Sequence, residues 1–147
     1  MNTAQIRRAL SHHHLTKYFF KGVFPRDKAM KIPKNKIFSV IFNTDPSGKP
    51  GEHWVAFHIT RNTVFYFDSY GLPPKGFAKI LRSRPKVKYF ARRLQGNGKE
   101  CGHYCLFFLL NMCQGKNSFP MFGKDFNAND RIVKRYVEKH FRGIAQQ

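Results

Sequence analysis

A glycine-rich loop runs directly into an apolar block near residue 100 of this 147-residue chain. The loop spans residues 95–100 and contains two glycines, and the block covers Leu106–Leu110. Consecutive apolar residues occupy every side of a helix, so the pattern predicts a helix over about residues 102–113 that is buried on all sides. Cys101 stands at the junction, where the loop becomes the helix. The fold therefore has to bring this cysteine to the end of a buried helix.

The position of Cys101 suits a nucleophile. The positive end of the helix dipole favours a thiolate at a helix N-terminus. The side-chain amide of Gln95, six residues upstream, and the backbone N–H of Cys101 itself can hydrogen-bond an oxyanion. A buried structural thiol is the alternative interpretation, and it is the one we expect for Cys105 and Cys113, which lie inside the apolar helix.

Two blocks rich in aromatic and β-branched residues, 52–60 and 63–71, predict a β-hairpin that turns at residues 61–62. His53 opens the first strand and Asp68 closes the second, so antiparallel pairing places the two side chains next to each other. A histidine base that is oriented by a carboxylate is the general means of activating a nucleophile. The sequence therefore supplies Cys101 with a base, His53, and with a partner for that base, Asp68.

Other interpretations of these residues stay open. Glu52 adjoins His53, but neighbouring strand residues point to opposite faces, so it is poorly placed to hold the imidazole. Asp68 could instead cap the turn that follows it. His58 lies five residues along the strand from His53 and is expected to be structural. His103 could line a cleft, but no role is assigned to it.

The chain carries 27 basic and 8 acidic residues, a formal net charge of +19. No acidic residue occurs between Asp68 and Glu100. Such density of one sign favours binding to a polyanion, because neutralised phosphates release counterions. Solubility is the alternative explanation, but it rarely requires so large a charge. The residues expected to contact DNA or RNA are Lys75, Lys79, Arg82, Arg84, Lys86, Lys88, Arg92 and Arg93.

The length favours a single domain over residues 1–147. The first residues lack the apolar core of a signal peptide, and the longest apolar run is far shorter than a membrane span. The three cysteines all lie between residues 101 and 113, so they cannot join distant parts of the fold, which agrees with a reducing compartment. No C-x2-C pair occurs, and the spacings do not favour a metal site.

The pattern along the chain predicts an α+β fold, in which helices flank a central sheet. Beside the hairpin, the other expected elements are helices over 2–14, 75–82 and 127–142, strands over 37–42 and 87–92, a loop over 45–51 and a basic surface segment over 17–36.

The order His53, Asp68, Gln95, Cys101 resembles the adenovirus endopeptidase family and its relatives, the SUMO-specific cysteine proteases. The motifs His-Trp, Asp-Ser-Tyr-Gly and Cys-Gly carry the resemblance, which covers roughly residues 15–113. It implies a papain-like cysteine protease fold of the adenovirus protease type, with a mixed sheet. It also implies a catalytic role for His53, Asp68 and Cys101, oxyanion stabilisation by Gln95 and Cys101, and a narrow cleft bordered by Trp54 and Gly102 that admits glycine.

The sequence departs from this family in two ways. Adenovirus proteases are activated by a viral peptide tethered through a disulfide, and the matching segment here, residues 71–94, contains no cysteine. We therefore expect a peptide activator to be non-covalent or absent. The chain also ends sooner after its cysteine helix, which suggests a minimal version of the fold.

The resemblance implies a cysteine endopeptidase of a DNA virus or a virus-like transposon. Its expected substrates are virion precursor proteins, cut at glycine-containing sites during particle maturation. DNA is the expected cofactor, a monomer the expected state, and the virion and the host nucleus the expected locations. Two alternatives stay open: a SUMO- or ubiquitin-specific protease, and a catalytically silent, basic DNA-binding virion protein.

Overall fold

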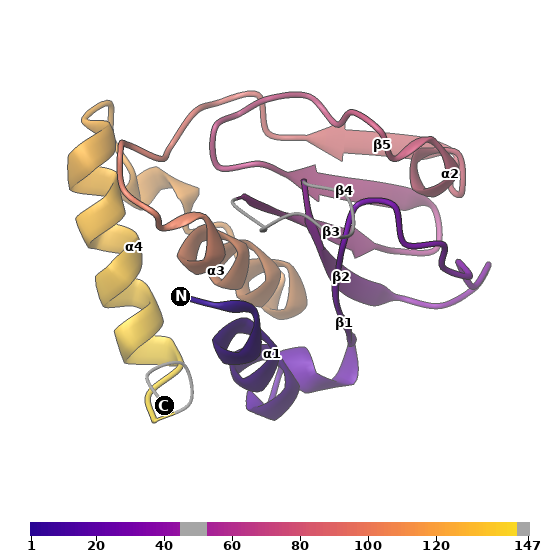
Figure 1. The fold of residues 1–147 in the computed structure, drawn as a ribbon, viewed down its shortest axis with the longest axis horizontal. Helices are drawn as coiled ribbons and strands as arrows, with labels where there is room; N and C mark the ends of the chain where they lie inside the picture. The colour runs from indigo at the N-terminus through magenta and orange to yellow at the C-terminus, as the bar shows by residue number, and fades with distance from the viewer. Residues whose placement is uncertain (45–52, 144–147) are drawn as a thin grey trace.

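The structure is a computed structural model that describes residues 1–44 and 53–143. Within them, five strands form one mixed sheet in the order β1-β2-β3-β4-β5 (Figure 1). Strands β2, β3 and β4 pair antiparallel, and the edge strands β1 and β5 pair parallel with their neighbours. The strands are β1 (Phe20–Phe24), β2 (Phe38–Asn43), β3 (Trp54–Ile59), β4 (Thr63–Phe67) and β5 (Lys86–Tyr89).

Helices cover both faces of this sheet. Figure 1 shows α1, α3 and α4 gathered on one side of the sheet, with the short α2 beside β5. The α+β architecture with a mixed sheet flanked by helices is therefore confirmed. The helices are α1 (Thr3–His12), α2 (Ala78–Leu81), α3 (Cys101–Gln114) and α4 (Phe126–His140), with 3-10 turns η1 (Thr16–Tyr18) and η2 (Phe119–Met121).

Strand alternation divides the apolar residues into two cores. On β3, Trp54 and Ala56 pack with α1, α3 and α4, whereas Val55 and Phe57 pack on the other face, against Phe77 and α2. Successive side chains of a strand point to opposite faces of the sheet, so the same strand contributes to both cores. Helix α3 is buried along its whole apolar block, as the uninterrupted run predicts.

The hairpin is confirmed. Strands β3 and β4 pair with Ala56 opposite Phe67 and Ile59 opposite Val64, and a backbone hydrogen bond of 2.9 Å joins the Thr60 N–H to the Thr63 carbonyl. Helices α1, α3 and α4 and strand β2 lie within two residues of their predicted bounds. The predicted loop 45–51 and Glu52 lie outside the described residues.

Three predictions about the remaining segments need correction. The basic segment 17–36 overlaps η1 and contains the edge strand β1, whose Val23 and Phe24 reach the two cores. Helix α2 begins later than predicted because Gly76 has a φ of +88°, which an α-helix does not accommodate. Strand β5 ends before Phe90, since this ring turns inward to stack on Phe119 at 4.3 Å between centroids.

Arg84 was predicted to contact nucleic acid, and this is wrong. Its side chain is 6% exposed, and its guanidinium donates hydrogen bonds to the carbonyls of Thr60, Pro33, Ser83 and Lys36, at 2.6 to 3.3 Å. The guanidinium therefore holds the 33–36 segment and the hairpin turn against the connection between α2 and β5, and its donors point inward.

Arg84→Ala is expected to lower the free energy of unfolding by about 3 kcal/mol, because it leaves several buried carbonyls without a donor. Urea unfolding followed by circular dichroism measures this change. Arg82→Ala is the matched control, since Arg82 is exposed, and surface substitutions change stability by less than about 0.5 kcal/mol. Equal effects of the two substitutions would contradict the structural role of Arg84.

Candidate active site

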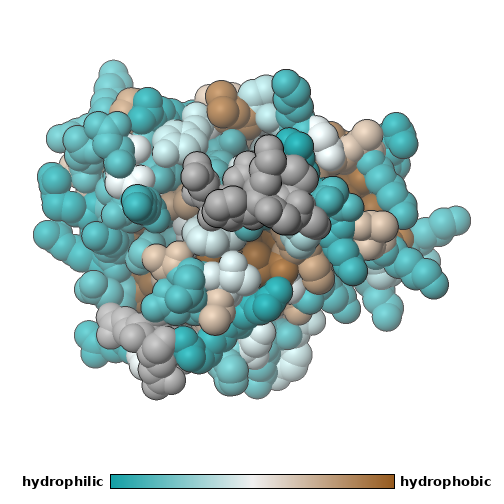
Figure 2. Space-filling view, in the orientation of Figure 1, coloured by the Kyte–Doolittle hydropathy of each residue, from teal (hydrophilic) through white to brown (hydrophobic). Residues whose placement is uncertain are grey.

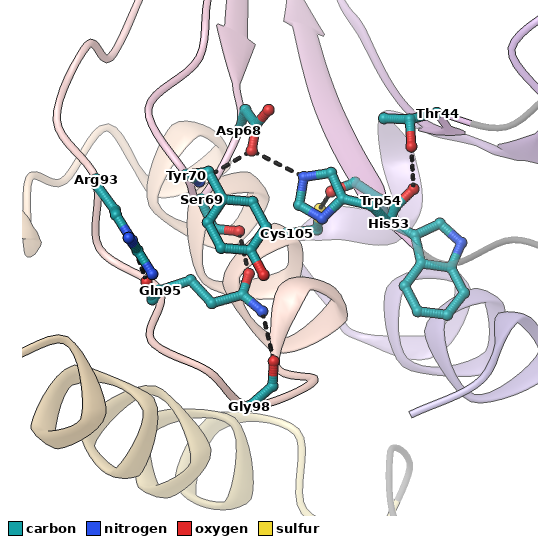
Figure 3. A network of polar contacts seen from close by, with 10 residues as sticks. All are labelled: Thr44, His53, Trp54, Asp68, Ser69, Tyr70, Arg93, Gln95, Gly98 and Cys105. Atoms are coloured by element: carbon teal, nitrogen blue, oxygen red, sulfur yellow. Dashed lines mark hydrogen bonds and ion pairs between the residues drawn. The ribbon is translucent and has the colours of Figure 1, made fainter.

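The hairpin brings His53 and Asp68 together, as the sequence predicted. His53 immediately precedes β3 and Asp68 immediately follows β4, so both lie at the same end of the hairpin. His53 Nε2 and Asp68 Oδ1 are 2.8 Å apart, and the carboxylate is buried (Figure 3). Since the Asp68 carboxylate occupies Nε2, the imidazole has Nδ1 left for a second partner.

Asp68 also holds the turn that follows it. Its Oδ1 accepts the Tyr70 N–H at 2.9 Å, and its carbonyl accepts the Gly71 N–H at 2.8 Å. Gly71 has a φ of +72°, and a Cβ there would lie 2.6 Å from the Arg92 carbonyl carbon, so this turn requires glycine. The two interpretations of Asp68, turn cap and imidazole partner, are thus compatible: the turn fixes the carboxylate that bonds His53.

Cys101 is the first residue of α3 and is buried. Its thiol shares a hydrogen bond with His53, which places the imidazole between the thiol and the Asp68 carboxylate. Burial by itself lowers the pKa of His53. Hydrogen bonds to Asp68 and Cys101 and the charges of both groups outweigh it, and raise the pKa from 6.5 to about 9. The environment therefore favours a protonated imidazole beside the sulfur.

Gln95 is held in one orientation by two contacts. Its Oε1 accepts the Ser69 hydroxyl at 2.5 Å, and its Nε2 donates to the Gly98 carbonyl at 3.0 Å (Figure 3). A side-chain amide carries two N–H donors. Among the described residues Nε2 donates one hydrogen bond, which leaves its second N–H for a substrate oxygen in the cavity that Gln95 helps to line. The Gln95 amide and Cys101 thus border the same cavity, while the oxyanion role of Gln95 stays a prediction.

These side chains border a cavity of about 580 Å³. Trp54, which was predicted to border the cleft, lines it, and the Tyr70 ring covers the His53 imidazole at 5.0 Å between centroids. A cavity of this size is typical of a site for a small ligand or a few peptide residues. The lining residues are Met1, His53, Trp54, Tyr70, Gln95, Gly98, Lys99 and Cys101.

Gly102 is not among the residues that line this cavity, and its predicted place at the cleft stays a prediction. A Cβ at Gly102 would lie 3.1 Å from Ile6 Cδ1 and 3.4 Å from Met1 Sδ. The residue is buried against α1, and its missing side chain lets α1 approach the first turn of α3.

The other thiols are poorly suited to nucleophilic chemistry. Complete burial raises the pKa of Cys105, whose Sγ lies 3.5 Å from the Trp54 carbonyl oxygen. Burial likewise raises the pKa of Cys113 to about 11, although a hydrogen bond to Ser39 lowers it in part. Both thiols stay protonated at neutral pH, in agreement with the core role predicted for them.

Two further histidines are held neutral. Burial lowers the pKa of His58 to about 4, and its Nδ1 is hydrogen-bonded to the Ser39 hydroxyl at 2.7 Å, which confirms the structural role. Burial, the charge of the chain N-terminus and Lys134 lower the pKa of His103 to about 4. His103 does not line the catalytic cavity.

The basic residues predicted to contact nucleic acid differ in whether their charged groups are bound by other parts of the protein. Lys75, Lys79, Arg82, Lys86 and Lys88 are exposed, although Lys79 Nζ donates to the Met30 carbonyl at 3.2 Å. Arg84 is buried, and the remaining two, Arg92 and Arg93, contact neighbouring protein groups. Arg92 donates to the Phe122 and Gly123 carbonyls, and Arg93 donates to the Gln95 carbonyl while its guanidinium lies over the Tyr70 and Phe126 rings.

Within residues 1–44 and 53–143, no three His, Cys, Asp or Glu side chains gather in a group that could hold a metal ion. In the same part of the chain, no helix is long and apolar enough to cross a bilayer.

The residues that hold these groups in place were not predicted from the sequence. Ser69 fixes the Gln95 amide, and Asp130 on α4 accepts hydrogen bonds from the loop before Cys101. One sequence signal does mark Asp130. It shares the buried face of α4 with Val133 and Val137, and a carboxylate in an apolar helical stripe must have partners.

Asp68→Asn is expected to lower kcat/KM for peptide hydrolysis about 10²-fold or more, because the amide bonds the imidazolium less strongly than a carboxylate does. It should also change the pH profile. Burial, which lowers the pKa of His53, remains, whereas the Asp68 charge, which raises it, is removed. The alkaline limb of kcat/KM, expected near pH 9 in the wild type, therefore moves to lower pH. An unmoved limb would show that Asp68 does not set the protonation of His53.

Part of this chain is similar in sequence to viral proteases. No protein-family model matches the chain. It is 35% identical over 106 residues to a protein of Acanthamoeba polyphaga mimivirus that is named as a thiol protease. This alignment covers 61% of this chain and 34% of that protein. It is 32% identical over 98 residues to a cysteine protease of African swine fever virus, covering 56% and 36% of the two chains. The homologue from another isolate of that virus, 31% identical over 98 residues, is named a SUMO-1 cysteine protease.

The fold is similar to that of two solved structures. The crystal structure of the African swine fever virus protease aligns with a TM-score of 0.61 and 18% identity, over 95% of this chain and 66% of that one. ChlaDub1 from Chlamydia trachomatis aligns with a TM-score of 0.56 and 16% identity, over 76% and 61%. The chain spans about a third of the length of the curated viral relatives. Its sequence is thus similar to viral thiol and cysteine proteases, and its fold to that of the African swine fever virus protease and of ChlaDub1.

Proposed function

We propose that this protein is a cysteine endopeptidase that hydrolyses peptide bonds through an acyl-enzyme on Cys101. The observation that carries the proposal is the placement of the His53 imidazole between the Cys101 thiol and the Asp68 carboxylate, beside a cavity of about 580 Å³. The similarity to viral thiol and cysteine proteases supports the same activity.

The reaction follows from the roles of these groups. The Cys101 sulfur attacks the scissile carbonyl carbon, and the Gln95 amide and the N–H groups at the start of α3 stabilise the oxyanion. As the C–N bond breaks and the thioester forms, the His53 imidazolium gives its proton to the leaving amine. Water then attacks the thioester while His53 takes one of its protons. The acid product leaves and the thiol–imidazole pair is restored.

The proposed substrates are precursor proteins of a virus or virus-like element, cut at glycine-containing sites in the virion or the host nucleus. The Trp54 and Tyr70 rings beside His53 support a preference for a small residue before the scissile bond. The viral origin of the named relatives supports the substrate class.

Hydrolysis of short fluorogenic peptides tests the activity. Peptides with glycine before the scissile bond should be cleaved faster than the same peptides with leucine there, and Cys101→Ala should remove both activities. Turnover that persists in Cys101→Ala, or a preference for leucine, would contradict the respective part of the proposal.

A SUMO- or ubiquitin-specific protease is the second candidate, because one viral relative is named a SUMO-1 cysteine protease. Such an enzyme binds a folded modifier over a broad surface, so it should cleave a SUMO or ubiquitin precursor much faster than a peptide of the same terminal sequence. Equal or slower cleavage of the folded precursors favours the precursor-processing endopeptidase.

We also propose that the protein binds DNA through its exposed basic residues. Figure 2 shows hydrophilic side chains covering most of the face that it displays, and the net charge is +19. Lys86 and Lys88 on the exposed strand β5 carry two of these charges. The affinity for a labelled DNA duplex, measured by fluorescence anisotropy, should fall steeply as salt is added. The double variant Lys86→Ala, Lys88→Ala should reduce the slope of log K against log salt concentration by about 1 for each phosphate that these lysines neutralise. Binding that does not change with salt would contradict this.

A further inference from the structure

We propose that Asp130 is a positioning residue that anchors the loop carrying Gln95 and thereby sets the oxyanion site. The inference rests on the proposed cysteine protease function. It concerns a helix, α4, that contributes no side chain to the lining of the catalytic cavity.

The Asp130 carboxylate is buried and accepts hydrogen bonds from two elements at once. Its oxygens accept the Gly96 N–H at 3.0 and 3.2 Å and the Gly98 N–H at 3.4 Å. Its Oδ1 also accepts the Tyr104 hydroxyl at 2.8 Å, from the first turn of α3 after Cys101. One carboxylate therefore joins α4 to the loop before the cysteine and to the helix that the cysteine begins.

The loop is shaped to lie against this helix. A Cβ at Gly96 would lie 2.3 Å from Asn127 Oδ1 and 2.8 Å from Asp130 Oδ2, so a larger residue would force the loop away. Neighbouring residues of α4 extend the contact: Asn127 accepts the Asn97 N–H, and Asn129 donates to the Leu94 carbonyl at 3.1 Å. The backbone of residues 94–98 is thus held along its length by polar side chains of α4.

The anchor reaches the catalytic amide through Gly98. The Gly98 N–H is bound by Asp130, and the Gly98 carbonyl accepts the Gln95 Nε2 at 3.0 Å. Ser69 holds the other end of the same amide. If Asp130 releases Gly96 and Gly98, the Gln95 amide loses the fixed acceptor that aims it, whereas the His53–Asp68 contact on the hairpin is unaffected.

Two reactions of Cys101 separate this role from a general structural one. Peptide hydrolysis develops an oxyanion, but alkylation by iodoacetamide does not. In Asp130→Asn we expect kcat for peptide hydrolysis to fall about 10–100-fold with KM little changed, while the alkylation rate of Cys101 stays within about twofold. In a double variant with Gln95→Ala, Asp130→Asn should add no further loss, because both act on one group.

The matched control is Asp125→Asn, on the same helix. Asp125 caps α4 by accepting the Ala128 N–H at 3.1 Å, and its side chain is exposed. Because Asn is as good an N-cap as Asp, this substitution should keep the helix and leave both reactions unchanged. Tyr104→Phe is a milder test, since it keeps the ring and removes only the hydroxyl that orients Asp130. It should lower kcat for peptide hydrolysis less than Asp130→Asn does, and it should again leave the alkylation rate of Cys101 unchanged.

Unchanged kcat in Asp130→Asn, an equal fall of both reactions, or additive losses in the double variant would overturn the inference. Hydrogen exchange of the Gly98 amide gives a readout that needs no activity: it should accelerate in Asp130→Asn and not in Asp125→Asn, and equal exchange in both would also overturn it. Wild-type protein that is alkylated rapidly but hydrolyses no peptide would instead count against the proposed function.

Discussion

Replacing Cys101 with alanine is expected to abolish peptide hydrolysis, lowering kcat/KM to the background of the assay. Alanine removes the only sulfur that shares a hydrogen bond with His53 within the described residues. It should also remove the rapid, single-site labelling by iodoacetamide at pH 6–7, where an ordinary thiol with a pKa of about 8.5 reacts slowly. Intact-mass spectrometry and a fluorogenic peptide assay measure the two effects.

Cys113→Ala is the control for this substitution. Burial raises the pKa of that thiol to about 11, so its removal should leave both labelling and hydrolysis unchanged. Slow labelling divided among Cys101, Cys105 and Cys113 in the wild type would mean that the thiol–imidazole pair is not assembled. The basic, catalytically silent DNA-binding protein would then be the better account.

Replacing His53 with glutamine is expected to lower kcat for hydrolysis by about 10³-fold or more, because both proton transfers then lack their carrier. It should also slow the alkylation of Cys101 at pH 6–7, since the imidazolium that favours the thiolate is gone. Glutamine keeps a hydrogen-bonding side chain near Asp68, so the fold should survive. His12→Gln, at an exposed histidine of α1, should change neither reaction.

The same substitution alters how stability depends on pH. The pKa of His53 is raised in the folded protein from 6.5 to about 9, so between these values the folded state binds more protons than the unfolded one. Its stabilising contribution is complete below pH 6.5 and is lost as the pH rises through about 9. The wild type should therefore lose more stability than His53→Gln between pH 6 and about 9.5. If urea unfolding shows that the free energy of unfolding of the two proteins changes equally over this pH range, a raised pKa is contradicted.

Local sequence patterns predicted the parts of the site that depend on short-range structure. Alternating aromatic and β-branched residues determine the hairpin, and its closure brings His53 to Asp68. The apolar run determines that α3 is buried and that Cys101 stands at its start. These features follow from the period of side chains along one strand or helix, so a single sequence is enough to find them.

Features that depend on distant contacts were missed. In the sequence, Arg84 is indistinguishable from the other basic residues around it. Only the fold shows that its guanidinium donates to the carbonyls of Thr60 and Pro33, which are distant in the chain. Asp130 lies 29 residues after Cys101, and nothing local links it to the loop 94–98. Strand β1 is short, lies at the sheet edge and contains a glycine, so its pattern was too weak to predict.

Trapping the acyl-enzyme tests the central claim most directly. The protein is mixed with an activated ester of a glycine-terminated peptide, quenched in acid within a turnover, and mapped by mass spectrometry after digestion. We predict one acyl group on the peptide that contains Cys101, accumulating in the wild type and absent in Cys101→Ala. Turnover of the ester with no acyl group on Cys101, or with the same adduct mass in Cys101→Ala, would contradict a nucleophilic Cys101.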